Sequence, residues 1–224
     1  MTYAPPQFPT GSSLAELCRE IKFVDAKTRE LGPWKSGAFS ILASHGCLAG
    51  WIKKKDGGTE ASEEDIMRLL VAVSSCCLTT ALALTQWASA VRIISKGNEK
   101  IRARFLPDLA TGRQFTTVGI SQLTTSRQHL RRPILTARRK NTGWSLDGQC
   151  PWVTGADSVN TLVTGAVPMD SEGFQASPHF YILKLSTSGI QVAPPMKLLA
   201  LTGSRTSRID LKNAFTEVEI SPQI

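Results

Sequence analysis

The sequence predicts an α+β protein in which a helical half is followed by a half made of β-strands. Up to about Gly112, apolar residues recur at three- and four-residue steps, which is the period of an amphipathic helix. Beyond Gly112, short β-branched or aromatic runs alternate with glycine, proline, serine and asparagine, which is typical of strands joined by turns. Helices followed by strands indicate segregated layers or two domains. We therefore expect a helical domain over residues 1–112 and a β domain over residues 113–224.

The first helix is expected to begin at Ser12 or Ser13 and to run to about Leu31. A serine hydroxyl accepts a hydrogen bond from a free amide of the first turn, which makes serine a preferred capping residue. Gly32 and Pro33 then end the helix. The apolar positions with helical spacing are Leu14, Leu17, Ile21 and Val24.

A second, shorter helix is expected over residues 34–44, followed by a loop rich in glycine and charge over residues 45–62. Ser62 opens the next helix, because Ser62 and Asp65 have the spacing of a capping box. The uncharged run over residues 69–91 predicts a long buried helix. This run is long enough to cross a bilayer, but its many serines and threonines argue against a lipid-facing span.

The last helix of this half is expected over residues 96–112, with a break at Pro107 and its end at Gly112. After it, each run that favours a strand is bounded by turn residues. The expected strands are residues 114–121, 132–140, 143–149, 159–167, 179–186, 189–194, 207–211 and 215–220.

The charge of the chain leaves several classes of partner open. With 26 Lys+Arg against 18 Asp+Glu, the net charge of +8 fits nucleic acid, an anionic surface, a phosphate-rich small molecule or a solvated surface. Nucleic acid is not expected, because no recognition motif is found and only 7% of residues are aromatic. The five cysteines form no C-x-x-C pair and no zinc-ligand spacing with histidine, so no metal site is expected. Free thiols and the lack of a signal pattern indicate a cytoplasmic protein.

The segment "GQCPWVTGAD", residues 148–157, places an indole and a hydroxyl two residues apart between glycines. Around it, "GWIKKKDGGTEAS", "KGNEKIRARFLPDLATG", "TTVGISQ", "WSLDGQCPWVTGADSVNTLVTGA" and "ALTGSRTSRIDLKNAFTEVEISP" follow one another in order. These five segments resemble successive landmarks of the acyl-CoA dehydrogenase family over about residues 46–222. The L-P-x-L-A-x-G turn and the W-x-T segment are the most specific of them.

The resemblance implies an N-terminal helical domain, a middle β-barrel-like domain and a C-terminal four-helix bundle that this sequence lacks. It implies FAD as the cofactor, with Trp152 beside the flavin ring and the Thr154 hydroxyl bonded to the ring nitrogen that accepts hydride. Upstream, it implies flavin contacts at Ile120, Ser121 and Ser126. The residues alone leave a structural alternative, in which Trp152 caps the barrel and Thr154 bonds its own backbone in a turn.

The upstream segment "SQLTTSRQ", residues 121–128, departs from the family pattern T-E-P-G-A-G-S-D. Gln122 replaces the acid, Leu123 replaces the proline, and both glycines are lost. The neighbouring Arg127 and Arg131 could hold a pyrophosphate or a CoA nucleotide, or could be solvated.

The leading functional hypothesis is a flavoprotein that oxidises an acyl-CoA or a related small molecule, homo-oligomeric in its complete form. In the family, the catalytic carboxylate lies in the bundle, so no residue of this chain is assigned as the general base. Two alternatives stay open. One is a flavin-dependent monooxygenase on the same fold, and the other is a non-catalytic module that keeps the fold without the cofactor.

Overall fold

The computed structural model describes residues 7–28, 34, 37–124, 133–169, 173 and 177–220 of the chain. Helices occupy the first half and strands the second half, so the expected α+β class is confirmed. The helices are α1 (Ser12–Thr28), α2 (Ala38–Ser44), α3 (Glu63–Cys76), α4 (Leu78–Ile94), α5 (Glu99–Ala110) and α6 (Ser121–Thr124), with the 3-10 turns η1 (Leu48–Trp51), η2 (Lys54–Asp56) and η4 (Thr202–Ser204).

The strands of the described residues join in one mixed sheet, in the order β6-β7-β3-β2-β4-β5-β8, with β1 beside β4. Both β1 and β2 pair with β4 in parallel, and the other pairs are antiparallel. The strands are β1 (Thr116–Gly119), β2 (Leu135–Lys140), β3 (Gly143–Val153), β4 (Thr161–Met169), β5 (His179–Lys184), β6 (Ile190–Val192), β7 (Ser207–Thr216) and β8 (Glu219–Ile220).

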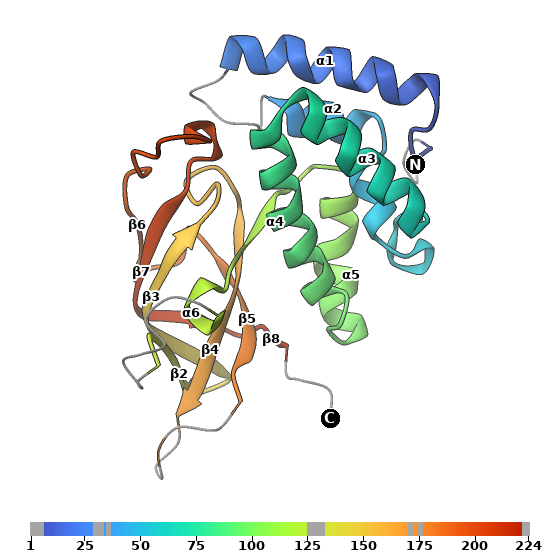
Figure 1. The fold of residues 1–224 in the computed structure, drawn as a ribbon. Coiled ribbons are helices and arrows are strands. Elements are labelled where there is room, and N and C mark those ends of the chain that lie inside the picture. The colour runs from blue at the N-terminus through green and yellow to red at the C-terminus, as the bar shows by residue number, and fades with distance from the viewer. Residues whose placement is uncertain are drawn as a thin grey trace.

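Figure 1 shows α1 to α5 gathered on one side and the strands, with the short α6, on the other, and α4 faces the strands. One apolar core joins the two parts, since Trp87 of α4 belongs to the same buried cluster as Val163 and Ile182 of the sheet. A second core contains Tyr181 of β5 and Ile209 of β7, which are not neighbours in the strand order. The sheet must therefore curl around this second core.

The first helices begin close to where the sequence predicts them. α1 starts at Ser12, and the Ser62 hydroxyl accepts a hydrogen bond from the Asp65 amide at 3.1 Å, as the capping box predicts. The second helix starts at Ala38 and not at residue 34, and the expected loop over residues 45–62 contains η1 and η2.

The uncharged run over residues 69–91 is not one helix, contrary to expectation. Cys77 has extended backbone angles (φ −155°, ψ 101°) and separates α3 from α4. Its sulfur accepts a hydrogen bond from the Thr80 amide at 3.4 Å and so caps α4. No glycine or proline marks the break in the sequence, which is why the pattern did not reveal it. Among the described residues, no helix has both the length and the hydropathy needed to cross a membrane.

Pro107 does not break the last helix, which is a second correction. α5 continues through Pro107 to Ala110. Proline removes one amide donor, but the turn after it is completed by the Thr111 amide, which donates to the Pro107 carbonyl at 3.3 Å. Gly112 follows with φ +68°, the left-handed conformation that favours glycine at a helix end.

Several strand boundaries differ from expectation, and among them the strand expected over residues 207–211 continues to Thr216 as β7. The strand expected over residues 114–121 ends at Gly119, and α6 follows it. β3 extends beyond residue 149 to Val153, so the W-x-T segment begins inside a strand. The strand expected over residues 215–220 is divided by a bend at Glu217, which leaves its first residues in β7 and its last two in β8.

Candidate functional site

A pocket of about 410 Å³ lies where α4 meets the ends of β1 and β3 and the segment around η4. We call it the β1–β3 pocket. Its walls come from parts of the chain that are far apart in sequence but joined by the sheet. The lining residues are Leu82, Gln86, Val118, Ile120, Ser121, Trp152, Thr154, Leu198, Ala200, Leu201, Ser204 and Thr206.

Four of the five residues that the sequence analysis assigned to a flavin line this pocket. The fifth, Ser126, lies outside the described residues, as do the arginines at positions 127 and 131. The two segments meet because the Thr117 hydroxyl of β1 donates to the carbonyl of Thr154 at 2.8 Å. The four residues that line the pocket are Ile120, Ser121, Trp152 and Thr154.

The indole of Trp152 is half exposed at the pocket, with 51% of its surface accessible. The pairing of β3 with β7 shifts register between Cys150 and Val153. A bulge of this kind changes the direction in which a side chain points. Here Cys150 and Val153 stay fully buried, while Trp152 between them turns outward and presents a large apolar surface.

The side chain of Thr154 is buried beside this indole, with 8% of the residue exposed. Its hydroxyl lies 3.3 Å from the Thr206 hydroxyl, which in turn lies 2.8 Å from the Ser204 hydroxyl. Among the described residues, the Thr154 hydroxyl therefore contacts the side chain of Thr206, which lines the same wall of the pocket. Sequence analysis used the "TGSRT" segment only as a landmark and missed Ser204 and Thr206, although its density of hydroxyls was a usable signal.

The segment around η4 is fixed to the turn that follows β3. The Gly155 amide donates to the Ser204 carbonyl at 2.9 Å, and the Arg205 guanidinium pairs with Asp157. Leu201 and Arg205 both have positive φ, at +59° and +49°, on either side of η4. Non-glycine residues in this conformation are strained, and such strain gathers where a loop must hold a defined shape.

The Asp157 carboxyl is held in its charged form by this contact. Partial burial alone raises its pKa, but hydrogen bonds from Arg205 and Ser158 outweigh burial and hold the pKa of Asp157 below its usual range. The two Arg205 Nε contacts to this carboxylate measure 2.9 Å each. The pair therefore stays ionised at neutral pH and ties the two sides of the pocket together.

Gly155 is required at its position in this turn. Its φ is +68°, and a Cβ added there would lie 2.1 Å from the ring of Trp34. Trp34 is itself buried and stacked on Phe39, with ring centroids 4.8 Å apart, so the ring cannot move aside easily. The glycine of the "PWVTG" segment thus allows the turn to pack directly on an aromatic ring.

Gln122, which stands where the family pattern has an acid, does not line the pocket. Its amide nitrogen lies at 3.0–3.1 Å from the Gly119 carbonyl, the Thr164 hydroxyl and the Gly165 carbonyl. The neighbouring Cys150 is fully buried, and burial raises the pKa of its thiol to about 12. These residues hold α6 on the sheet as uncharged groups, so the polar contacts found for Gln122 are structural.

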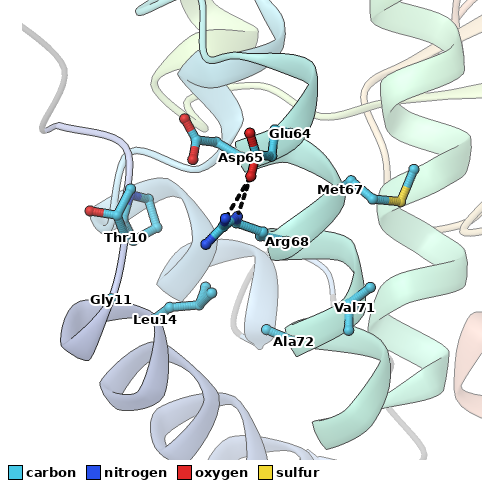
Figure 2. Close-up of a pocket in the computed structure, with 10 residues that line it drawn as sticks. Thr10, Gly11, Leu14, Glu64, Asp65, Met67, Arg68, Val71 and Ala72 are labelled. Carbon is cyan, nitrogen blue, oxygen red and sulfur yellow. Dashed lines mark hydrogen bonds and ion pairs between the residues drawn. The ribbon is translucent and has the colours of Figure 1, made fainter.

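A larger hollow, about 650 Å³, lies between the start of α1 and α3, and we call it the α1–α3 groove. Figure 2 shows its side chains, with Arg68 joined to Glu64 along α3. Met67 and Val71 add exposed apolar surface. Its lining residues are Pro9, Thr10, Gly11, Leu14, Glu64, Asp65, Met67, Arg68, Val71 and Ala72. Within the part of the chain that the structure describes, no three potential metal ligands come together in this groove or elsewhere.

Residues 15–113 match the family model described as "Acyl-CoA dehydrogenase, N-terminal domain". Curated protein sequences gave no match. Among solved structures, PigA with FAD and proline superposes with a TM-score of 0.77 at 15% identity, covering 97% of this chain and 60% of PigA.

Two further structures show the range of relatives. Dibenzothiophene monooxygenase (TdsC) from Paenibacillus sp. A11-2 has a TM-score of 0.74 at 15% identity, covering 91% of this chain and 50% of TdsC. A glutaryl-CoA dehydrogenase from Mycobacterium smegmatis in complex with FADH2 has a TM-score of 0.74 at 16% identity, with coverage of 96% and 56%. At these identities the likeness establishes the fold, and the chain spans only about half the length of the relatives.

Proposed function

We propose that this chain is the flavin-facing part of an FAD-dependent oxidoreductase, because residues 15–113 match the family model of the acyl-CoA dehydrogenase N-terminal domain. One observation carries the proposal. The β1–β3 pocket places the exposed indole of Trp152 beside the buried hydroxyl of Thr154, on the fold of relatives solved with FAD. A bound flavin supplies a hydride acceptor, which no amino-acid side chain provides.

The lining of the pocket fits a planar ring system with a polar edge. Leu82 and Val118 supply apolar walls, Trp152 supplies an aromatic surface, and Thr154 supplies a hydroxyl. The volume of about 410 Å³ falls in the range of small-molecule sites. It suits the isoalloxazine ring of FAD, whereas the pyrophosphate and adenosine need space beyond this pocket.

Each residue has a defined task in this proposal. The Trp152 indole covers the ring and excludes water from it, and the buried Thr154 hydroxyl offers a hydrogen bond to an atom of the ring edge. A fixed donor aimed at developing negative charge stabilises a transition state more than a ground state. Ile120 and Ser121 complete the wall on the β1 side.

The substrate, the assembly and the location of the protein are further parts of the proposal. The family match favours an acyl-CoA or a related small molecule as substrate, in a homo-oligomer of the cytoplasm. Among the residues described, we assign none as the general base. An acyl-CoA substrate is therefore supported by the family match and not by a contact within the pocket.

Two alternative functions have an observation in their favour. The fold of a dibenzothiophene monooxygenase matches this chain as well as that of a glutaryl-CoA dehydrogenase does, which favours monooxygenation equally. A non-catalytic module is favoured by Gln122, whose contacts serve the sheet. Incorporation of an oxygen atom from ¹⁸O₂ into an organic substrate, which free reduced flavin does not bring about, distinguishes the first alternative, and the absence of flavin binding supports the second.

The test is a titration of FAD into the 224-residue chain, followed by flavin fluorescence. We expect saturable quenching by the Trp152 indole, and loss of this quenching in Trp152→Ala. Thr154→Val is expected to weaken binding by about 2- to 10-fold, the effect of losing one neutral hydrogen bond. Trp144→Phe is the matched control, because Trp144 does not line the pocket. We expect this variant to keep the wild-type quenching of flavin fluorescence and the wild-type affinity for FAD.

The proposal is overturned if wild-type protein gives no saturable quenching up to millimolar FAD. It is also overturned if the wild type and the two pocket variants bind FAD equally. Thermal unfolding of each variant, measured in parallel, shows whether a lost signal reflects the pocket or the loss of folded protein.

A further inference from the structure

Three hydroxyl groups form a row in the wall of the β1–β3 pocket. The Ser204 Oγ lies 2.8 Å from the Thr206 Oγ1, which lies 3.3 Å from the Thr154 Oγ1. Ser204 is fully buried, and Thr206 and Thr154 are 7% and 8% exposed. All three residues line the pocket, and Thr154, at one end of the row, is the residue that the proposed function places against the flavin.

A hydroxyl group carries one proton, and this makes the row directional. Each hydroxyl donates one hydrogen bond and can accept others. When Thr206 donates to Thr154, the proton of Thr154 is left to point into the pocket. When Thr154 donates to Thr206, a lone pair of Thr154 faces the pocket instead. The contact between these two oxygens therefore sets whether Thr154 acts as a donor or as an acceptor toward a ligand.

The backbone around Thr206 is held from several directions. The Met196 amide donates to the Thr206 carbonyl at 2.9 Å, and β7 begins at the next residue. On the other side, Arg205 is fixed by its ion pair with Asp157. The Thr206 hydroxyl is consequently a fixed point from which the Thr154 hydroxyl can be oriented.

We infer that Thr206, supported by Ser204, is a positioning residue that orients the Thr154 hydroxyl toward the flavin. This inference rests on the proposed function. The ring nitrogen that accepts hydride is a hydrogen-bond acceptor in the oxidised flavin and carries a proton in the reduced flavin. Rotation of the Thr154 and Thr206 hydroxyls lets Thr154 donate to the first form and accept from the second. No covalent bond is made or broken.

The chain offers a matched set of variants for the test. Thr206→Val removes the hydroxyl and keeps the shape, and Thr206→Ser restores the hydroxyl. Thr216→Val removes a buried hydroxyl at the far end of β7, where it donates to the Ile182 carbonyl. Isothermal titration of oxidised FAD, and of dithionite-reduced FAD under nitrogen, gives two dissociation constants for each protein.

We expect Thr206→Val to weaken the binding of reduced FAD about 2- to 10-fold more than the binding of oxidised FAD, which changes the ratio of the two dissociation constants. Thr154 can still donate to the oxidised ring in this variant, but when it accepts from the reduced ring its own proton has lost the Thr206 oxygen as acceptor. Thr206→Ser is expected to return the ratio to the wild-type value, and Thr216→Val to lower only the melting temperature. A merely structural role for Thr206 would lower stability and weaken both forms equally, leaving the ratio unchanged.

The outcomes separate this inference from the proposed function. If wild-type protein binds FAD and Thr154→Val weakens it, but Thr206→Val keeps the wild-type ratio, the positioning role is overturned and the flavin site stands. If no protein in the set binds either form of FAD, the proposed function fails and the positioning role fails with it.

Discussion

The α1–α3 groove and the β1–β3 pocket differ in what holds their walls. The α1–α3 groove is the larger of the two, at about 650 Å³ against about 410 Å³, but its walls are two helices and the residues just before the first of them. The β1–β3 pocket is bounded by a bulged strand end and by the strained segment around η4, which a hydrogen bond from the Gly155 amide to the Ser204 carbonyl ties to the turn after β3. The candidate site is therefore distinguished from the groove by the fixed backbone of its walls and not by its volume.

The ion pair of the groove is exposed to solvent, whereas three hydroxyl groups of the pocket are buried. In the α1–α3 groove, Arg68 is paired with Glu64 along one helix, and both side chains are largely exposed. In the β1–β3 pocket, the hydroxyls of Thr154, Ser204 and Thr206 are buried and meet at one wall. Buried polar groups are costly unless they are hydrogen-bonded, so the contacts among these three hydroxyls stabilise this wall of the pocket.

The largest expected effect compares Gly155, in the turn beside the β1–β3 pocket, with Gly11 of the α1–α3 groove. Gly155→Ala is expected to lower the free energy of unfolding by about 3 kcal/mol or more, because a Cβ there adds a clash with Trp34 to the strain of a positive φ. Gly11 of the groove also has a positive φ, at +54°, but nothing lies within 4 Å of its Cβ position. Gly11→Ala should therefore show only the conformational cost, about 1 kcal/mol.

Thermal unfolding checks this pair. The expected losses correspond to roughly 6–12 °C for Gly155→Ala and about 2–4 °C for Gly11→Ala. Equal losses would mean that the packing of the turn on Trp34 contributes nothing, and that the two walls are not held differently.

The next effect concerns the exposed apolar residue of each hollow. Trp152→Ala is expected to weaken FAD binding by about tenfold, because an aromatic contact with the ring is lost. Met67→Ala, which removes a comparably exposed apolar side chain from the groove, should leave FAD affinity unchanged. Isothermal titration of FAD into both variants measures the difference, because Trp152→Ala lacks the indole that quenches flavin fluorescence. A weaker affinity in Met67→Ala would place the ligand in the groove.

The fold could be predicted from the sequence where the signal was local, and it could not be predicted where the structure depends on packing between distant segments. Helical spacing correctly placed α1, and the glycine at position 112 correctly marked the end of α5, because these signals are local. The break at Cys77 was missed, since it depends on how α3 and α4 pack and not on a breaking residue. The division into two domains at about residue 112 stays a prediction.

The candidate site was partly readable for a related reason. Trp152 and Thr154 stood out because an indole and a hydroxyl are unusual neighbours between glycines. Thr206 lies 52 residues further along the chain, and only the pairing of β3 with β7 brings it to Thr154. No local pattern encodes that pairing, so this part of the site required the structure.

A smaller effect is expected at the ion pair of the pocket wall. Asp157→Asn should lower the free energy of unfolding by about 1 kcal/mol, because a partly buried pair with Arg205 is lost. The pKa of Asp157 is lowered in the folded protein, so its contribution is present above the pKa of the unfolded chain and is lost as pH falls through the folded pKa.

The measurement is the difference in melting temperature between wild type and Asp157→Asn as a function of pH. This difference should be constant above about pH 5 and should shrink below about pH 4. A difference that persists unchanged in acid would show that the carboxylate charge is not what joins the two loops.

The smallest effect is expected at the ion pair of the groove, and it tests the comparison most directly. Glu64 and Arg68 lie four residues apart on α3, with 72% and 68% of their side chains exposed. Water and salt screen such a pair, and holding two long side chains together costs conformational entropy. Glu64→Gln is therefore expected to leave the melting temperature unchanged within error at pH 7.

The matched measurement is the thermal unfolding of Asp157→Asn at the same pH. In that pair, only 26% of the Asp157 side chain and 27% of the Arg205 side chain are exposed. If Glu64→Gln destabilises the protein as much as Asp157→Asn does, the groove is held by its charges as firmly as the pocket. The distinction between an ordinary helix surface and a constrained wall would then be wrong.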